Sequence, residues 1–119
     1  MGRQWYREGR LNKKHKSFED VEACLKHLHD AGYSCAGKTA VCGTSAGGLL
    51  MATVCNRSPH LIKAAVLKVP FVDVLNTMLD PMQPLTSQEY EEFGNPLDDR
   101  NILDYIDRIP FNAVNCKYE

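Results

Sequence analysis

The fold of this chain is decided by the stretch Val41-Cys42-Gly43-Thr44-Ser45-Ala46-Gly47-Gly48. It contains the pattern Gly-x-Ser-x-Gly, which follows one apolar run and precedes a second, Leu49-Leu50-Met51-Ala52. This order predicts a short buried strand, a sharp turn and then a helix, the arrangement called a nucleophile elbow. We expect the hydroxyl of Ser45 to be exposed at the tip of that turn.

The neighbours of Ser45 have expected roles in such a turn. Gly43 and Gly47 have no Cβ, so the strand and the helix are expected to approach closely at these residues. The N–H of Ala46 is expected to point at a developing oxyanion, helped by the positive end of the following helix. An ordinary Gly/Ser turn that joins a strand to a helix is the alternative interpretation.

The composition is that of a globular protein with one small core. The 119 residues carry a net charge of −1, so neither nucleic acid nor a membrane surface is an expected partner. The basic residues 13–16, with Arg10 nearby, are interpreted as a solvated loop. No apolar run approaches the roughly 18 residues of a membrane span. Five cysteines without a C-x-x-C pair, and no leader in residues 1–5, predict reduced thiols in a cytoplasmic protein.

Hydrophobic spacing along the rest of the chain predicts alternating helices and strands. The first helix is expected to begin at a Ser17 cap and to end before Gly32, with an apolar stripe of Phe18, Val21, Leu25 and Leu28. The other expected elements are strands over 39–42 and 64–69, helices over 46–56 and 101–109, and a helical turn over 89–93 with a Thr86 capping box. Residues 1–16 and 74–85 are expected to be irregular.

This order of elements predicts an α/β fold. Two strands alone make no stable sheet, so residues 1–119 are expected to be the central piece of a larger domain. Asp73 follows the second strand at its carboxyl end, where open α/β sheets bind ligands. It is a candidate catalytic carboxylate, with capping of the next helical turn as the alternative. His27 and His29 are expected to be solvated on the first helix.

Three segments resemble the prolyl oligopeptidase family, most closely its oligopeptidase B and prolyl-endopeptidase-like members. Residues 1–14 are similar to the family's segment G-x-x-W-(Y/H)-x-x-G-(R/K)-x-x-K-K. The elbow Gly43-Thr44-Ser45-Ala46-Gly47-Gly48 is similar to its G-x-S-x-G-G. The third and most distinctive segment consists of Val69-Pro70-Phe71-Val72-Asp73-Val74, Thr77-Met78-Leu79-Asp80, Pro84-Leu85-Thr86, and the run from Glu89 through Gly94-Asn95-Pro96.

The resemblance implies a partial α/β-hydrolase fold, a β-propeller in a separate segment, no cofactor or metal, and cleavage of short peptides. By position, Ser45 is the nucleophile and the Ala46 N–H is half of the oxyanion hole. Oligopeptidase B prefers Arg or Lys before the scissile bond, and Glu89 and Glu91 match the acidic pair that holds this side chain. Residues two apart in a regular helix point in nearly opposite directions, so these two converge only on irregular backbone. A solvated Glu-rich turn is the alternative.

The resemblance also implies that parts of the site lie outside residues 1–119. The triad runs Ser, Asp, His along such chains. His15, His27 and His29 precede Ser45, and His60 follows it too closely to be the base. Two main hypotheses follow: a serine endopeptidase sequence that is truncated, or a genuine short product that is inactive or serves as an interaction module. A carboxylesterase is a third, because the elbow serves esters and amides alike.

Overall fold

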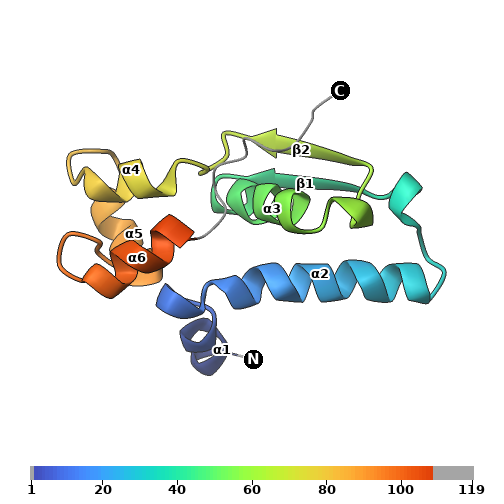
Figure 1. Cartoon of the computed structure of the whole chain (residues 1–119), viewed down its shortest axis with the longest axis horizontal. Helices are drawn as coiled ribbons and strands as arrows, with labels where there is room; N and C mark the ends of the chain where they lie inside the picture. The colour runs from blue at the N-terminus through green and yellow to red at the C-terminus, as the bar shows by residue number, and fades with distance from the viewer. Residues whose placement is uncertain (1, 109–119) are drawn as a thin grey trace. The chain divides into compact units, whose positions relative to one another are not determined.

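The structure is a computed structural model, and it describes residues 2–108. Two compact units divide the described chain: residues 17–72 form one, and residues 2–16 together with 73–108 form the other. Figure 1 labels the longer elements, which are α1 (Arg3–Glu8), α2 (His15–Asp30), β1 (Ala40–Thr44), α3 (Ala46–Arg57), β2 (Ala64–Lys68), α4 (Val74–Leu79), α5 (Thr86–Phe93) and α6 (Arg100–Arg108). Short 3₁₀ helices are η1 (Leu11–Lys13), η2 (Ala36–Lys38) and η3 (Pro59–Leu61).

Residues 17–72 contain a parallel sheet of β1 and β2, which are connected through α3. The register pairs Ala40 with Ala64 and Thr44 with Lys68. A helix between the strands is the connection that parallel pairing requires. The predicted α/β fold is confirmed, and both predicted strands and the predicted helix after Ser45 are present within two residues of their expected bounds.

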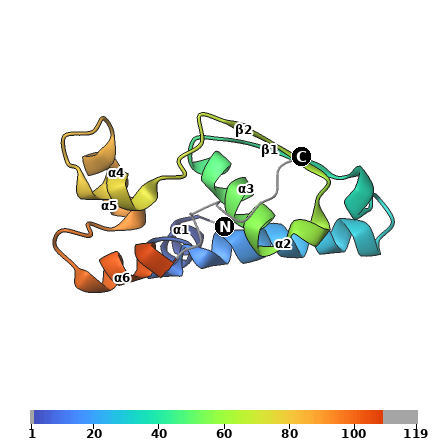
Figure 2. The same cartoon turned by 45° about the horizontal axis from the view of Figure 1, so that its top comes forward.

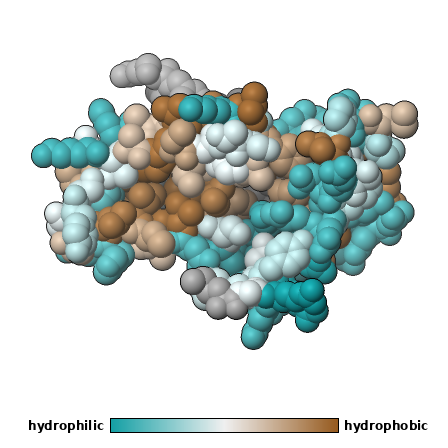
Figure 3. All heavy atoms as spheres, turned by 180° about the vertical axis from the view of Figure 1, so that it is seen from behind, coloured by the Kyte–Doolittle hydropathy of each residue, from teal (hydrophilic) through white to brown (hydrophobic). Residues whose placement is uncertain are grey.

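Within residues 17–72, the two strands are covered on one face only. Helices α2 and α3 lie on the same side of them in both ribbon views (Figures 1 and 2). Cys42 and Val66 are paired in register on the other face, where Val66 is 52% exposed. Figure 3, seen from behind, shows apolar surface gathered over this part of the sheet. The prediction of fully buried strands is therefore wrong for this chain, because no element of residues 17–72 covers the second face.

Helix α2 differs from its predicted form at its start and along its buried side. It begins at His15, two residues before the expected Ser17 cap. Phe18 and Leu25 are buried as predicted, whereas Leu28 is exposed. Glu22 is buried instead, on the side of the helix that carries Phe18 and Leu25.

Polar partners explain two of the side chains on α2. The Arg57 Nε lies 3.1 Å from the Glu22 Oε1, and the Ser58 hydroxyl donates to the same oxygen at 3.1 Å. These partners allow a carboxylate to be buried between α2 and the end of α3. His29, which was expected to be solvated, has its Nε2 2.9 Å from the Thr39 Oγ1, so that expectation is wrong.

In the other unit, helices occupy both segments that were expected to be irregular. Gly9 follows α1 rather than preventing it, and its N–H donates to the Tyr6 carbonyl. In α4, Val74 and Met78 are fully buried and lie four residues apart, on one side of the helix. The prolines that argued against a helix, at positions 81 and 84, come after α4 has ended.

Helix α5 ends as predicted at Gly94, whose φ of 87° is left-handed. The predicted capping box is wrong, because Leu85 is the N-cap residue and the Thr86 hydroxyl donates instead to the Thr77 carbonyl at 3.1 Å. Helix α6 buries Ile102 and Ile106, and the predicted last residue, Ile109, lies outside the described residues. None of the helices within residues 2–108 has the length and apolarity that a membrane crossing requires.

Candidate active site

Ser45 lies between the end of β1 and the start of α3, as the sequence predicts. Its φ of 53° and ψ of −121° place it in a region that side chains other than glycine rarely adopt. A residue held there costs on the order of 1–3 kcal/mol, so the surrounding structure must impose it. Ser45 is exposed. The predicted sharp turn with an accessible serine is therefore present, and an ordinary unstrained turn is excluded.

Three backbone hydrogen bonds of Ser45 fix this conformation. The Ser45 N–H donates to the Lys68 carbonyl at 3.1 Å, and the Ser45 carbonyl accepts from the Phe71 N–H at 3.0 Å. The same carbonyl accepts from the Leu49 N–H at 3.1 Å, which closes the first turn of α3. The backbone of Ser45 is thus held by its own helix and by the segment that follows β2.

Two glycines allow the close packing around this turn, and one of them, Gly43, is one of the two expected. A Cβ on Gly43 would lie 2.2 Å from the Gly47 carbonyl oxygen, so no side chain fits at position 43. A Cβ on Gly47 would meet nothing within 4 Å, so the expected role of its missing side chain is wrong. At Gly48 a Cβ would lie 2.7 Å from the Pro70 Cβ, which makes this the second required glycine.

Ala46 is the first residue of α3, so its N–H has no partner inside the helix. The start of a helix carries a partial positive charge, and Ser45 makes no side-chain cap bond there. The Ala46 N–H next to an exposed serine hydroxyl is the arrangement that can stabilise an oxyanion on an attacked carbonyl carbon.

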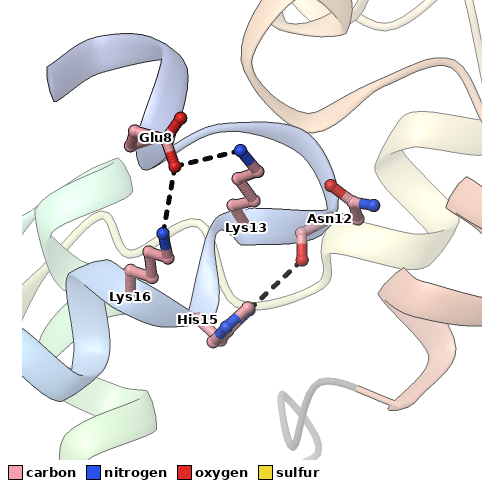
Figure 4. Close-up of polar contacts among 5 residues, drawn as sticks. All are labelled: Glu8, Asn12, Lys13, His15 and Lys16. Atoms are coloured by element: carbon pink, nitrogen blue, oxygen red, sulfur yellow. Dashed lines mark hydrogen bonds and ion pairs between the residues drawn. The ribbon is translucent and has the colours of Figure 1, made fainter. Parts of the chain in front are cut away.

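Among residues 17–72, no histidine is hydrogen-bonded to the Ser45 side chain. The His15 Nδ1 lies 3.2 Å from the Asn12 carbonyl oxygen (Figure 4), and His29 is paired with Thr39. His27 and His60 are exposed.

Asp73 occupies the N-cap position of α4, but its carboxylate makes no cap bond to the backbone. Both carboxylate oxygens instead accept from the Asn76 side-chain amide, at 2.9 and 3.1 Å. The Thr77 hydroxyl donates to the Asp73 carbonyl at 2.6 Å. Side-chain capping of the backbone, the alternative to a catalytic role, is thus not what this carboxylate does.

Glu89 and Glu91 are both part of the regular helix α5. Two positions correspond to roughly 200° around a helix axis, so the structure does not bring the two carboxylates together. Glu91 forms an ion pair with Arg10 at 3.2 Å, and the next residue, Glu92, forms one with Lys14. No local pattern predicts these pairs, because their partners are about 80 residues apart in the chain.

The basic residues near the N-terminus are paired with acids rather than merely solvated. The Nζ atoms of Lys13 and Lys16 lie 3.0 and 3.1 Å from the same Glu8 oxygen (Figure 4). The hydrogen bond from Lys13, followed by that from Lys16, lowers the pKa of Glu8 below its ordinary value.

Comparisons with known proteins agree with this geometry. The model of the prolyl oligopeptidase family matches residues 1–118. The human protein named prolyl endopeptidase-like is 47% identical over 119 residues, which cover 99% of this chain and 16% of that relative. Dipeptidyl aminopeptidase BI of Pseudoxanthomonas mexicana is 46% identical over 106 residues, 89% of this chain and 14% of its own length.

A solved structure extends the similarity to the backbone. Oligopeptidase B from Trypanosoma brucei with covalently bound antipain, in its closed form, matches with a TM-score of 0.86 and 43% identity over 92% of this chain. The match covers 15% of that structure, so this chain spans about one-sixth of the length of the relatives that it matches. The α/β architecture, the elbow and the match over residues 1–118 together confirm the resemblance: this chain belongs to the prolyl oligopeptidase family.

Proposed function

We propose that this chain is the central part of the α/β-hydrolase catalytic domain of a serine endopeptidase, and that Ser45 is its nucleophile. The observation that carries the proposal is the exposed, left-handed Ser45 between β1 and α3. Non-glycine residues held in such strained conformations cluster at active sites. Family membership supports the same reaction class.

In the proposed reaction, the Ser45 hydroxyl attacks the carbonyl carbon of a short peptide and gives up its proton to a base. The Ala46 N–H donates to the oxyanion of the tetrahedral intermediate. Collapse of this intermediate releases the amine and leaves an acyl group on Ser45, which water then removes. The base and its orienting acid, and the propeller, belong to the rest of the longer protein. Residues 1–119 alone are proposed to be inactive, because a serine hydroxyl is a weak nucleophile without a base.

For the substrate, we propose a peptide with Arg or Lys before the scissile bond. The support is the resemblance of Glu89 and Glu91 to the acidic pair of oligopeptidase B. A carboxylate pairs well with a guanidinium through charge-assisted hydrogen bonds. Because α5 points the two side chains in opposite directions, we propose that one of them makes the main contact with the basic side chain.

Labelling with a fluorophosphonate tests the proposal, since this reagent reacts with activated serines. We expect the full-length protein to be labelled at Ser45 and the variant Ser45→Ala to be unlabelled. Ser34→Ala is the matched control, because Ser34 is bonded to Thr39 away from the elbow. An unlabelled full-length protein would remove the peptidase proposal and leave an inactive interaction module. Turnover of an ester but no peptide would favour a carboxylesterase.

A further inference from the structure

The segment Lys68-Val69-Pro70-Phe71, at the carboxyl end of β2, holds Ser45 by both of its backbone groups. The Lys68 carbonyl accepts from the Ser45 N–H at 3.1 Å, and the Phe71 N–H donates to the Ser45 carbonyl at 3.0 Å. Rotation about either φ or ψ of Ser45 would break at least one of these bonds. The segment thus opposes relaxation of the strained serine in both directions.

The path of this segment is itself strained. Val69 has a φ of 38°, which is a true outlier for a β-branched residue. The residue is 82% exposed, so burial of the valine does not explain the conformation. The chain has to turn sharply between Lys68 and Phe71 for a carbonyl and an N–H three residues apart to reach the same residue.

Pro70 is the contact that ties this turn to α3. A Cβ on Gly48 would lie 2.7 Å from the Pro70 Cβ and 2.8 Å from its Cα, so the proline lies directly on the helix backbone. Gly48 belongs to the first turn of α3, which also carries the Ala46 N–H. A rigid ring at position 70 fixes the φ of that residue and therefore the direction of the backbone on either side of it.

We propose that Pro70 is a positioning residue for Ser45. Packed on Gly48, it fixes the turn whose Lys68 carbonyl and Phe71 N–H hold the serine in its left-handed conformation. The proposal rests on the proposed function only where it predicts an effect on catalysis. The claim that Pro70 fixes the backbone of Ser45 does not depend on that function.

Amide hydrogen exchange of the full-length protein, followed by mass spectrometry of short overlapping peptides, tests the holding step. The variant Gly48→Ala forces Pro70 away from α3, so we expect exchange at the Ser45 and Phe71 amides to accelerate at least ~10-fold relative to the amides between β1 and β2. Gly47→Ala is the matched control, because the same change at the next position meets nothing within 4 Å. It is expected to leave both rates within about twofold of the original chain.

Pro70→Gly provides a second variant in case Gly48→Ala does not fold. It removes the ring without adding an atom to α3, and the same selective acceleration is expected. Equal acceleration of the sheet amides would mean general loss of structure and would overturn the proposal. The proposal would also be overturned if the Ser45 and Phe71 amides of the unsubstituted protein showed no protection from exchange.

The catalytic consequence is tested in the full-length protein. Misplacement of a nucleophile by about 1 Å can cost about 10²-fold in rate, so Gly48→Ala is expected to lower kcat at least ~10-fold with KM nearly unchanged. A purely structural role would reduce the amount of folded enzyme but not the labelling rate per folded molecule. If the original full-length protein is not labelled, the proposed function fails while the exchange data still decide the role of Pro70.

Discussion

The guanidinium of Arg10 lies 3.2 Å from the carboxylate of Glu91, so this acid already holds a cation from its own chain. The Arg10 side chain is 29% exposed and that of Glu91 is 72% exposed. The Tyr6 ring, 5.4 Å from the guanidinium carbon of Arg10, adds a cation–π contact. A substrate arginine that uses Glu91 must therefore displace Arg10 or share the carboxylate with it.

This competition predicts the effect of removing the internal cation. In the full-length protein, Arg10→Gln should raise kcat/KM for an arginine substrate relative to an alanine substrate by about two- to fivefold. This factor corresponds to the free energy of the exposed ion pair that the substrate no longer has to break. Lys13→Gln is the matched control, because Lys13 is paired with Glu8 instead. An Arg/Ala ratio that does not change in Arg10→Gln would mean that Glu91 does not contact the substrate.

The two candidate carboxylates are expected to contribute unequally. The double variant Glu89→Gln, Glu91→Gln should lose the preference for arginine over alanine substrates. Because α5 directs the two side chains apart, one of the single variants should reproduce most of this loss and the other should change little. Steady-state kinetics with paired arginine and alanine substrates measure the effect. Unchanged selectivity in the double variant would contradict the assignment, and equal losses in the singles would mean that the carboxylates converge.

The elbow could be predicted from the sequence because every signal for it is local. The apolar run, the Gly-x-Ser-x-Gly pattern and the apolar helix after it follow one another within residues 39–57, and the strained Ser45 is where they meet. What holds the serine could not be predicted in the same way. Pro70 and Gly48 are 22 positions apart, and only the parallel pairing of β1 with β2 brings them into contact.

Other differences have the same physical origin. Glycines and prolines predict irregular backbone in residues 1–16 and 74–85, but they only limit the short helices α1 and α4. The buried residues of α4, Val74 and Met78, belong to a helix that contacts the later helices α5 and α6. The predicted apolar stripe includes Leu28, which is exposed, whereas Glu22, which no apolar spacing indicates, is buried. The ion pair with Arg57 accounts for the burial of Glu22, because a buried carboxylate is tolerated when it is paired.

The buried Glu22 is expected to make Arg57 important for stability. Arg57→Ala removes one of its two partners and should lower the free energy of unfolding by about 1–3 kcal/mol, the cost of a poorly satisfied buried acceptor. Glu22→Gln should cost less, since its amide oxygen still accepts from Ser58. Urea denaturation measures both. Arg100→Ala is the matched control, because its ion pair with Asp104 is exposed, and a loss there equal to that of Arg57→Ala would contradict this explanation.

The Glu8 cluster predicts a pH-dependent local interaction. The hydrogen bonds from Lys13 and Lys16 lower the pKa of Glu8, so the folded state binds this proton less tightly than the unfolded state does. The stabilisation is therefore present above the unfolded pKa and is lost as the pH falls through the folded one. An NMR titration of the Glu8 carboxyl carbon should give a pKa below the ordinary value, and Lys13→Gln should raise it. High salt should raise it too, because the pair is exposed. An ordinary pKa that neither change moves would mean that the two lysines do not hold this carboxylate in solution.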